Sequence, residues 1–265
     1  MSGHGRTFVR NDYGCLGEAG RYGGSREHYF HFLLGYLLPL VHVQFQLQHS
    51  AFEVLECGPL MTPILDETLQ RLGLPARIVP HSAMVDPLPV EAWDHGWSDL
   101  DAVRATVDRI RRAWCPPACP QPDCPASEKL LLQRSPAPAY YLSGAAEKPG
   151  YGTSRRTITN GAAVSAHLSA QGIDHAIYEP GRHSLGCQIA SFRRARRIVG
   201  IRGAEWANVI WSCPGLAVRM YDPAPPARLV TALFERTAVR HEIAVAGSAL
   251  ISVDPSEVAR FLQGP

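Results

Sequence analysis

The sequence has very little lysine and no strong excess of charge of either sign. Lysine occurs only at Lys129 and Lys148 among 26 basic residues. Arginine, whose planar guanidinium group suits phosphate recognition, therefore carries almost all of the positive charge; a genome biased toward arginine codons would give the same composition. Because 24 acidic residues leave a formal net charge of only +2, there is no electrostatic basis for binding nucleic acid.

No segment of the sequence is long and apolar enough to cross a membrane. The most apolar stretch, Phe30 to Phe45, contains His31, Pro39 and His42 and falls short of the ~18 apolar residues that a span needs. The first residues are polar and glycine-rich and do not resemble a signal peptide. We therefore expect a cytoplasmic protein, and peripheral contact with a membrane is compatible with this sequence.

The seven cysteines form no recognisable metal-binding pattern. Cys115, Cys119 and Cys124 lie together in the segment CPPACPQPDC, which has no C-x-x-C spacing, no nearby histidine and too many prolines for regular structure. We interpret this segment as a proline-rich linker with reduced thiols, with a disulfide between two of its cysteines as the alternative. We predict no metal site.

The hydrophobic pattern stops at this linker and then begins again, which predicts two domains, residues 1–124 and 125–265. In the first domain we expect a helix over 28–40 that ends at Pro39, strands over 41–47, 52–57 and 76–80, and helices over 64–72 and 98–114. In the second we expect strands over 129–133, 176–178, 197–201 and 217–221, and helices over 160–171 and 185–196. This alternation is typical of parallel β-α-β units. The predicted fold class is α/β, with two Rossmann-like domains facing each other across a cleft.

The segment RIVGIRGAEWANVIWSCPG, residues 197–215, has the features of a phosphate-binding turn. A buried strand is followed by Arg202, Gly203 and Ala204, and then by a helix-like start through Asn208. Glycine lets backbone N–H groups approach a phosphate, and a helix start adds partial positive charge. Ligands of open α/β sheets bind beyond the carboxyl ends of the strands. Since many glycine-rich turns bind nothing, this pattern alone leaves both interpretations open.

Three other sequence motifs do not support a metal site, a dinucleotide-binding site or a hydrolase. Asp99-Leu100-Asp101 fits an Asp-x-Asp metal signature, but it opens an amphipathic helix, where acidic residues are favoured as caps. Gly150-Tyr151-Gly152 lacks the third glycine and the preceding strand of a dinucleotide-binding fingerprint. A Gly-x-Ser-x-Gly nucleophile elbow is absent from the sequence, which argues against a hydrolase.

Five segments together resemble glycosyltransferase family 61. In chain order they are YFHFL at 29–33, LLLQRS at 130–135, RTITNG at 156–161, SLGCQ at 184–188 and RGAEWAN at 202–208. The first is similar to the family's Tyr-Tyr-His-Trp-Leu segment, and the second to a strand that ends in arginine. The next two are similar to helix starts of the forms Arg-x-Ile-x-Asn-Glu and Ser-Leu-x-Glu-Gln. The last is similar to His-Gly-Ala-Gly-Leu-Ala-Asn, and the family's Pro-Gly follows it here as Pro214-Gly215.

Four residues depart from the family's motifs. Arg202 replaces the histidine of the last motif, and Glu205 replaces its second glycine. Cys187 and Gly161 each stand where the family has a glutamate. A change of donor, a shifted mechanism and a loss of activity would each account for these departures.

The resemblance implies a GT-B-like, metal-independent glycosyltransferase that moves a sugar from a nucleotide-sugar donor to a saccharide hydroxyl with inversion, as in capsular or extracellular polysaccharide biosynthesis. It implies no cofactor besides this co-substrate. His31 is the implied base for the acceptor, with a structural core histidine as the alternative. The implied donor-binding residues are Arg134, Ser184, Gln188, Arg202, Gly203, Ala204 and Asn208. The alternative function is a non-catalytic nucleotide- or saccharide-binding protein of the same fold; an unrelated Rossmann-like enzyme is disfavoured by the absent fingerprint.

Overall fold

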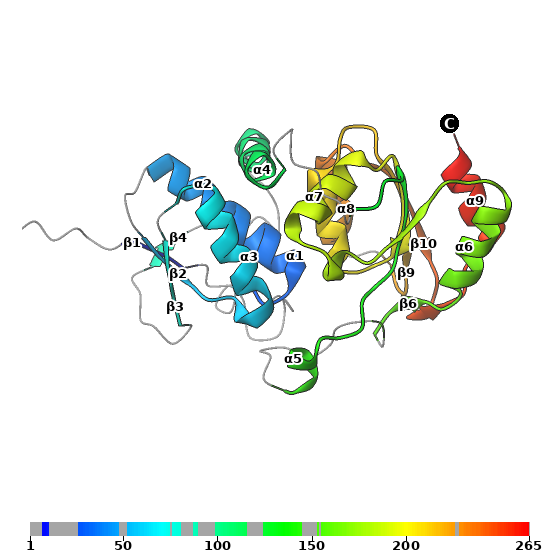
Figure 1. The fold of residues 1–265 in the computed structure, drawn as a ribbon, viewed down its shortest axis with the longest axis horizontal. Helices are drawn as coiled ribbons and strands as arrows, with labels where there is room; N and C mark the ends of the chain where they lie inside the picture. Colours follow the sequence, from blue (N-terminus) through cyan, green and yellow to red (C-terminus); the bar gives the residue numbers. More distant parts are fainter. Residues whose placement is uncertain are drawn as a thin grey trace, which may run out of the picture. The chain divides into compact units, whose positions relative to one another are not determined.

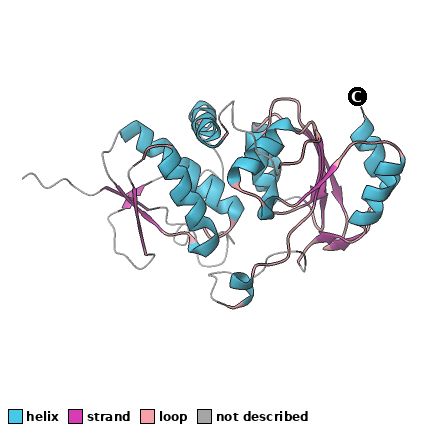
Figure 2. Cartoon of the chain, in the orientation of Figure 1, coloured by secondary structure: helices cyan, strands magenta, loops and turns pink. Residues whose placement is uncertain are grey.

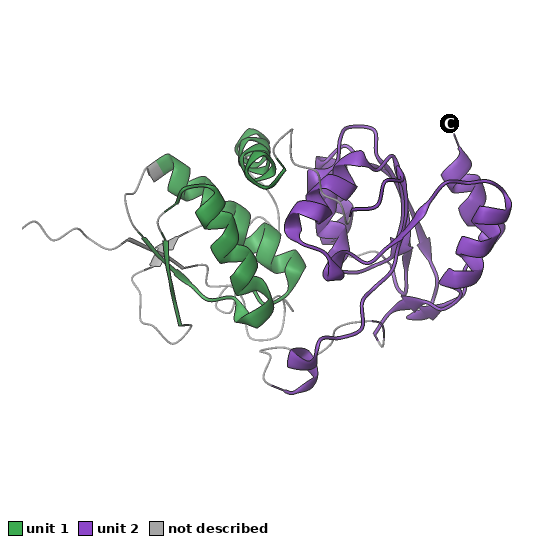
Figure 3. Cartoon of the chain, in the orientation of Figure 1, with its two compact units in different colours: residues 1–117, 146–148 green, residues 118–145, 149–265 purple. Residues whose placement is uncertain are grey.

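The computed structural model (Figure 1) describes residues 7–10, 26–47, 52–74, 76–80, 87–89, 99–115, 124–144, 153, 155–225 and 228–264. The described part combines helices with parallel strands (Figure 2) and confirms the α/β class. The chain divides into two compact units (Figure 3), residues 1–117 with 146–148 and residues 118–145 with 149–265. The predicted boundary at residue 124 stays a prediction, as does the cleft between domains, because most of the proline-rich linker lies outside the described residues.

The first unit contains a four-stranded parallel sheet in the order β3-β2-β1-β4. Its strands are β1 (Thr7–Arg10), β2 (Phe52–Leu55), β3 (Ala76–Val79) and β4 (Pro87–Pro89). The predictions over 52–57 and 76–80 are confirmed as β2 and β3. The strands β1 and β4 are additional to those that the sequence predicts.

The helix predicted over 28–40 does not end at Pro39, and the strand predicted over 41–47 is wrong. The chain forms an α-helix (α1, Tyr29–Phe32), a π-helix (η1, Leu33–Leu37) and a second α-helix (α2, Leu38–Leu47) without a break. Pro39 lies inside this continuous helical run, directly after the π-helix, and prolines and π turns are the usual places where a helix becomes irregular. Residues 32–41 are all buried, and within 41–46 the buried residues are Val41 and Gln44. This spacing of three fits a helix, and tertiary packing overrides the local alternation.

The other two predicted helices of the first unit are confirmed as α3 (Gly58–Arg71) and α4 (Leu100–Trp114). Asp99 caps α4, since its Oδ1 accepts hydrogen bonds from the backbone N–H groups of Asp101 and Ala102 at 3.0 and 2.9 Å. This geometry confirms the interpretation of Asp99 as a helix cap.

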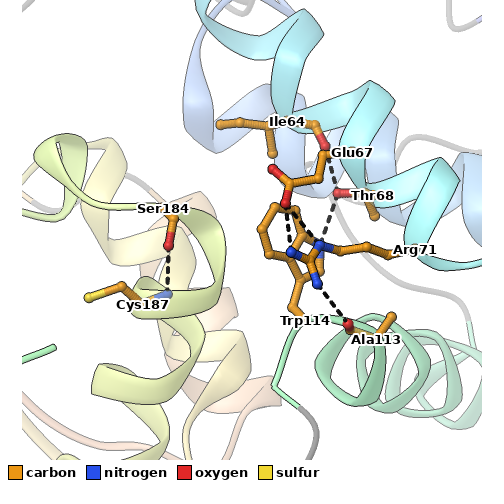
Figure 4. A network of polar contacts seen from close by, with 8 residues as sticks. All are labelled: Ile64, Glu67, Thr68, Arg71, Ala113, Trp114, Ser184 and Cys187. Carbon is orange, nitrogen blue, oxygen red and sulfur yellow. Dashed lines mark hydrogen bonds and ion pairs between the residues drawn. The ribbon is translucent and has the colours of Figure 1, made fainter. Parts of the chain in front are cut away.

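Side chains of α3 and α4 interlock through Trp114 (Figure 4). Its indole Nε1 donates a hydrogen bond to Thr68 Oγ1 at 3.1 Å. The guanidinium carbon of Arg71 lies 4.5 Å from the centroid of the same indole ring. Hydrogen bonding and a cation–π contact therefore fix the two helices against each other.

The second unit is built on a five-stranded parallel sheet in the order β10-β9-β8-β5-β7. The strands are β5 (Lys129–Leu132), β7 (Ala176–Tyr178), β8 (Arg197–Ile201), β9 (Ala217–Asp222) and β10 (Arg240–Val245). The four predicted strands of this half are confirmed, and β10 is additional. Numbered along the chain, the sheet order is 2-1-3-4-5, a doubly wound order in which the chain reverses direction across the sheet between β5 and β8.

Helices cover both faces of this sheet (Figure 1). On one face lie α6 (Gly161–Ala170) and α9 (Pro255–Gln263), which pack on a core that includes Val164, Val199 and Val258. The other helical segments of this unit are α5 (Ala139–Leu142), η2 (Pro180–Arg182), α7 (Leu185–Arg194), the 3₁₀-helix η3 (Ala204–Trp211) and α8 (Arg228–Arg236). A small parallel sheet joins β6 (Thr157–Ile158) to β11 (Leu250–Ile251). The helices predicted over 160–171 and 185–196 are confirmed as α6 and α7.

None of the helices in the described part of the chain has the length and hydrophobicity that crossing a membrane requires. Of the three cysteines of the proline-rich linker, Cys115 and Cys124 are thiols, and Cys119 lies outside the described residues.

Candidate functional site

The candidate site lies at the carboxyl ends of β5 and β8, between which the sheet order reverses. Arg134 follows β5, Arg202 and Gly203 follow β8, and Asp222 ends the neighbouring β9. The carboxyl ends of parallel strands meet at one edge of a sheet, and the reversal of strand order opens a crevice there. The two predicted arginines are therefore brought together at the place where open α/β sheets bind ligands.

Both arginines form ion pairs with carboxylates, and in each pair some polar atoms have no hydrogen-bond partner. Arg202 Nη1 lies 3.2 Å from Oδ1 of the fully buried Asp222, and Arg134 Nε lies 3.3 Å from Glu205 Oε1. Among the described residues, the four atoms Arg134 Nη1, Glu205 Oε2, Arg202 Nε and Asp222 Oδ2 are buried and have no hydrogen-bond partner. A buried polar group left unpaired costs about 1–3 kcal/mol, so the unused arginine donors favour the binding of an anion.

A third arginine, Arg156, acts electrostatically on the same site. It lies half-buried just before β6, and burial together with the positive charges of Arg155, Arg202 and Arg134 lowers the pKa of Arg156 to about 10. It therefore stays charged at neutral pH. We call Arg134, Arg156 and Arg202 the arginine cluster. Sequence reasoning did not assign Arg156 to the site, although it is the first residue of the quoted RTITNG segment.

Gly203 makes room for the Glu205 side chain and has an ordinary backbone conformation. Its φ of −166° is extended, but a Cβ at this position would collide with Glu205 Oε2 and would lie 3.1 Å from Arg134 Nε. Ala204 begins η3, so the predicted helix-like start is a 3₁₀-helix. The missing side chain at Gly203 leaves a space next to the arginine cluster, and the Glu205 carboxylate occupies it.

Three of the predicted donor-binding residues use their polar groups within the protein. The fully buried Asn208 donates a hydrogen bond to Gln188 Oε1 at 2.9 Å and accepts one from Trp211 Nε1 at 3.1 Å. Ser184 caps α7 by accepting a hydrogen bond from the backbone N–H of Cys187 at 3.2 Å (Figure 4). The hydrogen bond from Asn208 to Gln188 joins η3 to α7, and a contact of these three residues with substrate stays a prediction.

The residues that replace the family's two glutamates are tightly packed. Cys187 is buried, with Sγ 3.7 Å from the Tyr178 hydroxyl oxygen and 3.8 Å from Ser191 Oγ. A Cβ on Gly161, the first residue of α6, would lie only 2.5 Å from Gln133 Nε2. The side-chain amide of Gln133 therefore fills the space beside Gly161.

His31, the predicted base, belongs to the first unit, whereas the arginine cluster belongs to the second. It is the third residue of α1 and is partly exposed. Its ring packs edge-on against Phe30, with 5.4 Å between ring centroids, and 6.2 Å from the ring of His28. The role of His31 as the base stays a prediction.

The sequence predicts no metal site anywhere in the chain. The structure can be searched for such a site only in the residues that it describes. Within the residues that the structure describes, there is no group of three or more His, Cys, Asp or Glu side chains placed to hold a metal ion.

Comparison with known protein families identifies the family of the chain. The sequence profile of the family described as Glycosyltransferase 61 matches residues 29–219, which is 191 of the 265 residues. The matched span begins at α1 and includes the whole arginine cluster. No curated protein matches the sequence significantly.

Proposed function

The chain belongs to glycosyltransferase family 61, and on this premise we propose that it transfers a sugar from a nucleotide-sugar donor to a hydroxyl group of a saccharide, with inversion at the anomeric carbon. Membership of the family supports glycosyl transfer in general. The observation that supports a nucleotide-sugar donor is the arginine cluster at the point where the sheet order reverses. Guanidinium groups bind phosphate oxygens through paired, charge-assisted hydrogen bonds.

The arginine cluster fits the leaving group of such a donor. As the bond from the sugar to the diphosphate breaks, negative charge develops on the phosphate oxygens, and fixed positive charges stabilise it. Arg134 Nη1 and Arg202 Nε are buried donors without protein acceptors among the described residues. A phosphate that takes the place of the Glu205 carboxylate over Gly203 would reach the backbone N–H groups of Gly203 and Ala204. Because arginines supply the positive charge, we propose that transfer needs no metal ion.

The acceptor is activated by a base in this proposal. The acceptor oxygen attacks the anomeric carbon while the nucleoside diphosphate departs, and the hydroxyl proton passes to His31. A single displacement inverts the anomeric centre. An imidazole suits this role because it exchanges protons near neutral pH, and saccharides of the kind found in capsular or extracellular polysaccharides are the proposed acceptors.

A second candidate function is nucleotide or saccharide binding without catalysis. The observation that favours it is the packing at Cys187 and Gly161, where the family has glutamates. Cys187 is enclosed beside Tyr178, and Gln133 fills the space at Gly161. Neither position therefore supplies a carboxylate for catalysis.

The test begins with a thermal-shift screen of uridine, guanosine, cytidine and adenosine diphosphates and their sugar conjugates. A ligand that binds only the native state raises the melting temperature, so at least one nucleoside diphosphate is expected to stabilise the protein. Nucleotide release is then measured with a panel of saccharide acceptors, with and without EDTA, and EDTA should leave the rate unchanged. If no nucleotide stabilises the protein, the proposed donor is wrong; stabilisation without turnover favours the binding protein.

A further inference from the structure

The carboxylate of Glu205 lies between a glycine and an arginine. Glu205 is the second residue of η3, and its side chain folds back over Gly203, because a Cβ on Gly203 would collide with Glu205 Oε2. Its other oxygen, Oε1, is 3.3 Å from Arg134 Nε. The carboxylate therefore occupies the space that the missing side chain of Gly203 leaves beside the arginine cluster.

This position is also the one that a phosphate of the donor would take. A carboxylate and a phosphate both present delocalised anionic oxygens that accept hydrogen bonds from a guanidinium group. Arg134 Nε and the space over Gly203 cannot hold Glu205 and a phosphate at the same time. Glu205 therefore competes with a ligand phosphate for Arg134.

The second carboxylate of the site, Asp222, is held differently. Its side chain is fully buried, and its Oδ1 both pairs with Arg202 and accepts a hydrogen bond from the backbone N–H of Ala224 at 3.1 Å. The Glu205 side chain is 18% exposed, and its Oε2 has no partner among the described residues. Asp222 is thus a fixed counter-ion of Arg202. The side chain of Glu205 is longer and partly exposed, so it can move away from Arg134 toward solvent.

We propose that Glu205 is an internal competitor of the donor phosphate, which holds Arg134 and fills the space at Gly203 until a phosphate displaces it. This inference rests on the proposed function for the identity of the natural ligand. It makes Glu205 a determinant of affinity and specificity: a diphosphate, which can also reach the other two arginines, displaces the carboxylate more readily than a single phosphate does. The glycine that the family has at this position would lack such a competitor.

The test is calorimetric titration of the full chain with inorganic pyrophosphate and, separately, with the four nucleoside diphosphates. Glu205→Gln keeps the shape of the side chain and removes its charge, and we expect it to bind pyrophosphate about tenfold more tightly than the wild type, equivalent to about 1.4 kcal/mol. Glu205→Gly should show a gain of the same sign. Glu179→Gln is the matched control, because Glu179 follows β7 at the same edge but pairs with Arg182, which is 63% exposed; its affinity should equal that of the wild type.

Adding Arg134→Gln to Glu205→Gln should remove the gain, because the competition is for Arg134. Equal or weaker pyrophosphate binding by both Glu205 variants would overturn the inference, and so would the failure of every form to bind pyrophosphate. If Glu205→Gln binds pyrophosphate more tightly while no nucleoside diphosphate binds any form, the inference stands and the proposed donor fails. If nucleoside diphosphates bind the wild type and both variants equally, the proposed donor stands and the inference fails.

Discussion

Arg202, which directly follows β8, has two roles. It neutralises the fully buried carboxylate of Asp222 through a contact of 3.2 Å, and its Nε is a buried donor without a partner among the described residues. A single substitution would therefore leave a buried charge unpaired, at a cost of about 3–5 kcal/mol in stability. Removing both partners together avoids most of this cost.

We predict that Arg202→Gln combined with Asp222→Asn weakens binding of a nucleoside diphosphate much more than binding of the bare nucleoside, because only the diphosphate uses the guanidinium charge. Calorimetric titration of both ligands measures this difference. The control is Arg182→Ala, an arginine near the same edge of the sheet with 63% of its side chain exposed, which should bind both ligands as the wild type does. Equal losses for diphosphate and nucleoside would show that Arg202 does not contact phosphate.

His31 is the residue on which the proposed acceptor chemistry depends. We predict that His31→Ala lowers the rate of sugar transfer by ~10²–10⁴-fold, the usual contribution of a general base. Nucleotide affinity should change little, because the arginine cluster belongs to the other unit. His31→Gln, which retains hydrogen bonding but cannot take the proton, should be nearly as slow. A folded His31→Ala protein with a lower melting temperature and normal activity would identify the histidine as a core residue.

At the scale of elements, Asn208 joins α7 to η3 from the interior. Its side chain connects Gln188 of α7 with Trp211 at the end of η3 through hydrogen bonds of 2.9 and 3.1 Å. The turn that carries Arg202 and Gly203 enters η3 directly. The amide network therefore positions the start of η3 next to the arginine cluster.

We predict that Asn208→Ala lowers the free energy of unfolding by about 2–4 kcal/mol, because it leaves a buried amide oxygen and a buried indole N–H unpaired and opens a small cavity. Urea denaturation measures the loss. Gln171→Ala is the control, since Gln171 is exposed and its amide contacts the ring of His167 in an exposed hydrogen bond, so its removal should cost only a few tenths of that amount. If Asn208→Ala is as stable as the wild type but binds the nucleotide poorly, Asn208 is a ligand contact rather than a structural residue.

Burial, rather than local pattern, decides the longest helical region of the first unit. The alternation over 41–47 predicts a strand, yet the chain continues as α2. A π-helix over Leu33–Leu37 takes up the irregularity before Pro39, and residues 32–41 are all buried. Residues 32–41 have no polar face to mark a period, and over 41–46 the buried residues Val41 and Gln44 follow helical spacing rather than the alternation of the sequence.

At the scale of the whole molecule, the two units each contain a parallel sheet with its own helices (Figure 3). We predict that limited proteolysis with a broad-specificity enzyme cuts first within 115–125 or 144–152, because exposed connections of small and polar residues are the preferred sites of cleavage. Mass spectrometry of the fragments locates the cuts. First cleavage within 160–215, which contains α6, α7 and β8, would contradict the two-domain organisation.

The sequence by itself determined four strands of the second unit and the residues at the ends of two of them. Apolar runs located β5, β7, β8 and β9, and the residues that follow β5 and β8 placed Arg134 and Arg202 beyond the strand ends. The order of the five quoted segments also indicated the family. These features depend on neighbouring residues alone, because backbone geometry imposes a period of two on strands and of 3.6 on helices.

Only the tertiary structure decided which of these residues meet. The order of the strands across the sheet brings Glu205 to Arg134 and Asp222 to Arg202. It also places Arg156 close enough to act electrostatically on both arginines. The two ion pairs join residues that are 20 and 71 positions apart in the sequence. Such pairs produce no periodic pattern in a sequence, because they form only when separate strands lie side by side. For the same reason, the sequence marked Glu205 only as a departure from the family, whereas the fold shows which arginine it holds.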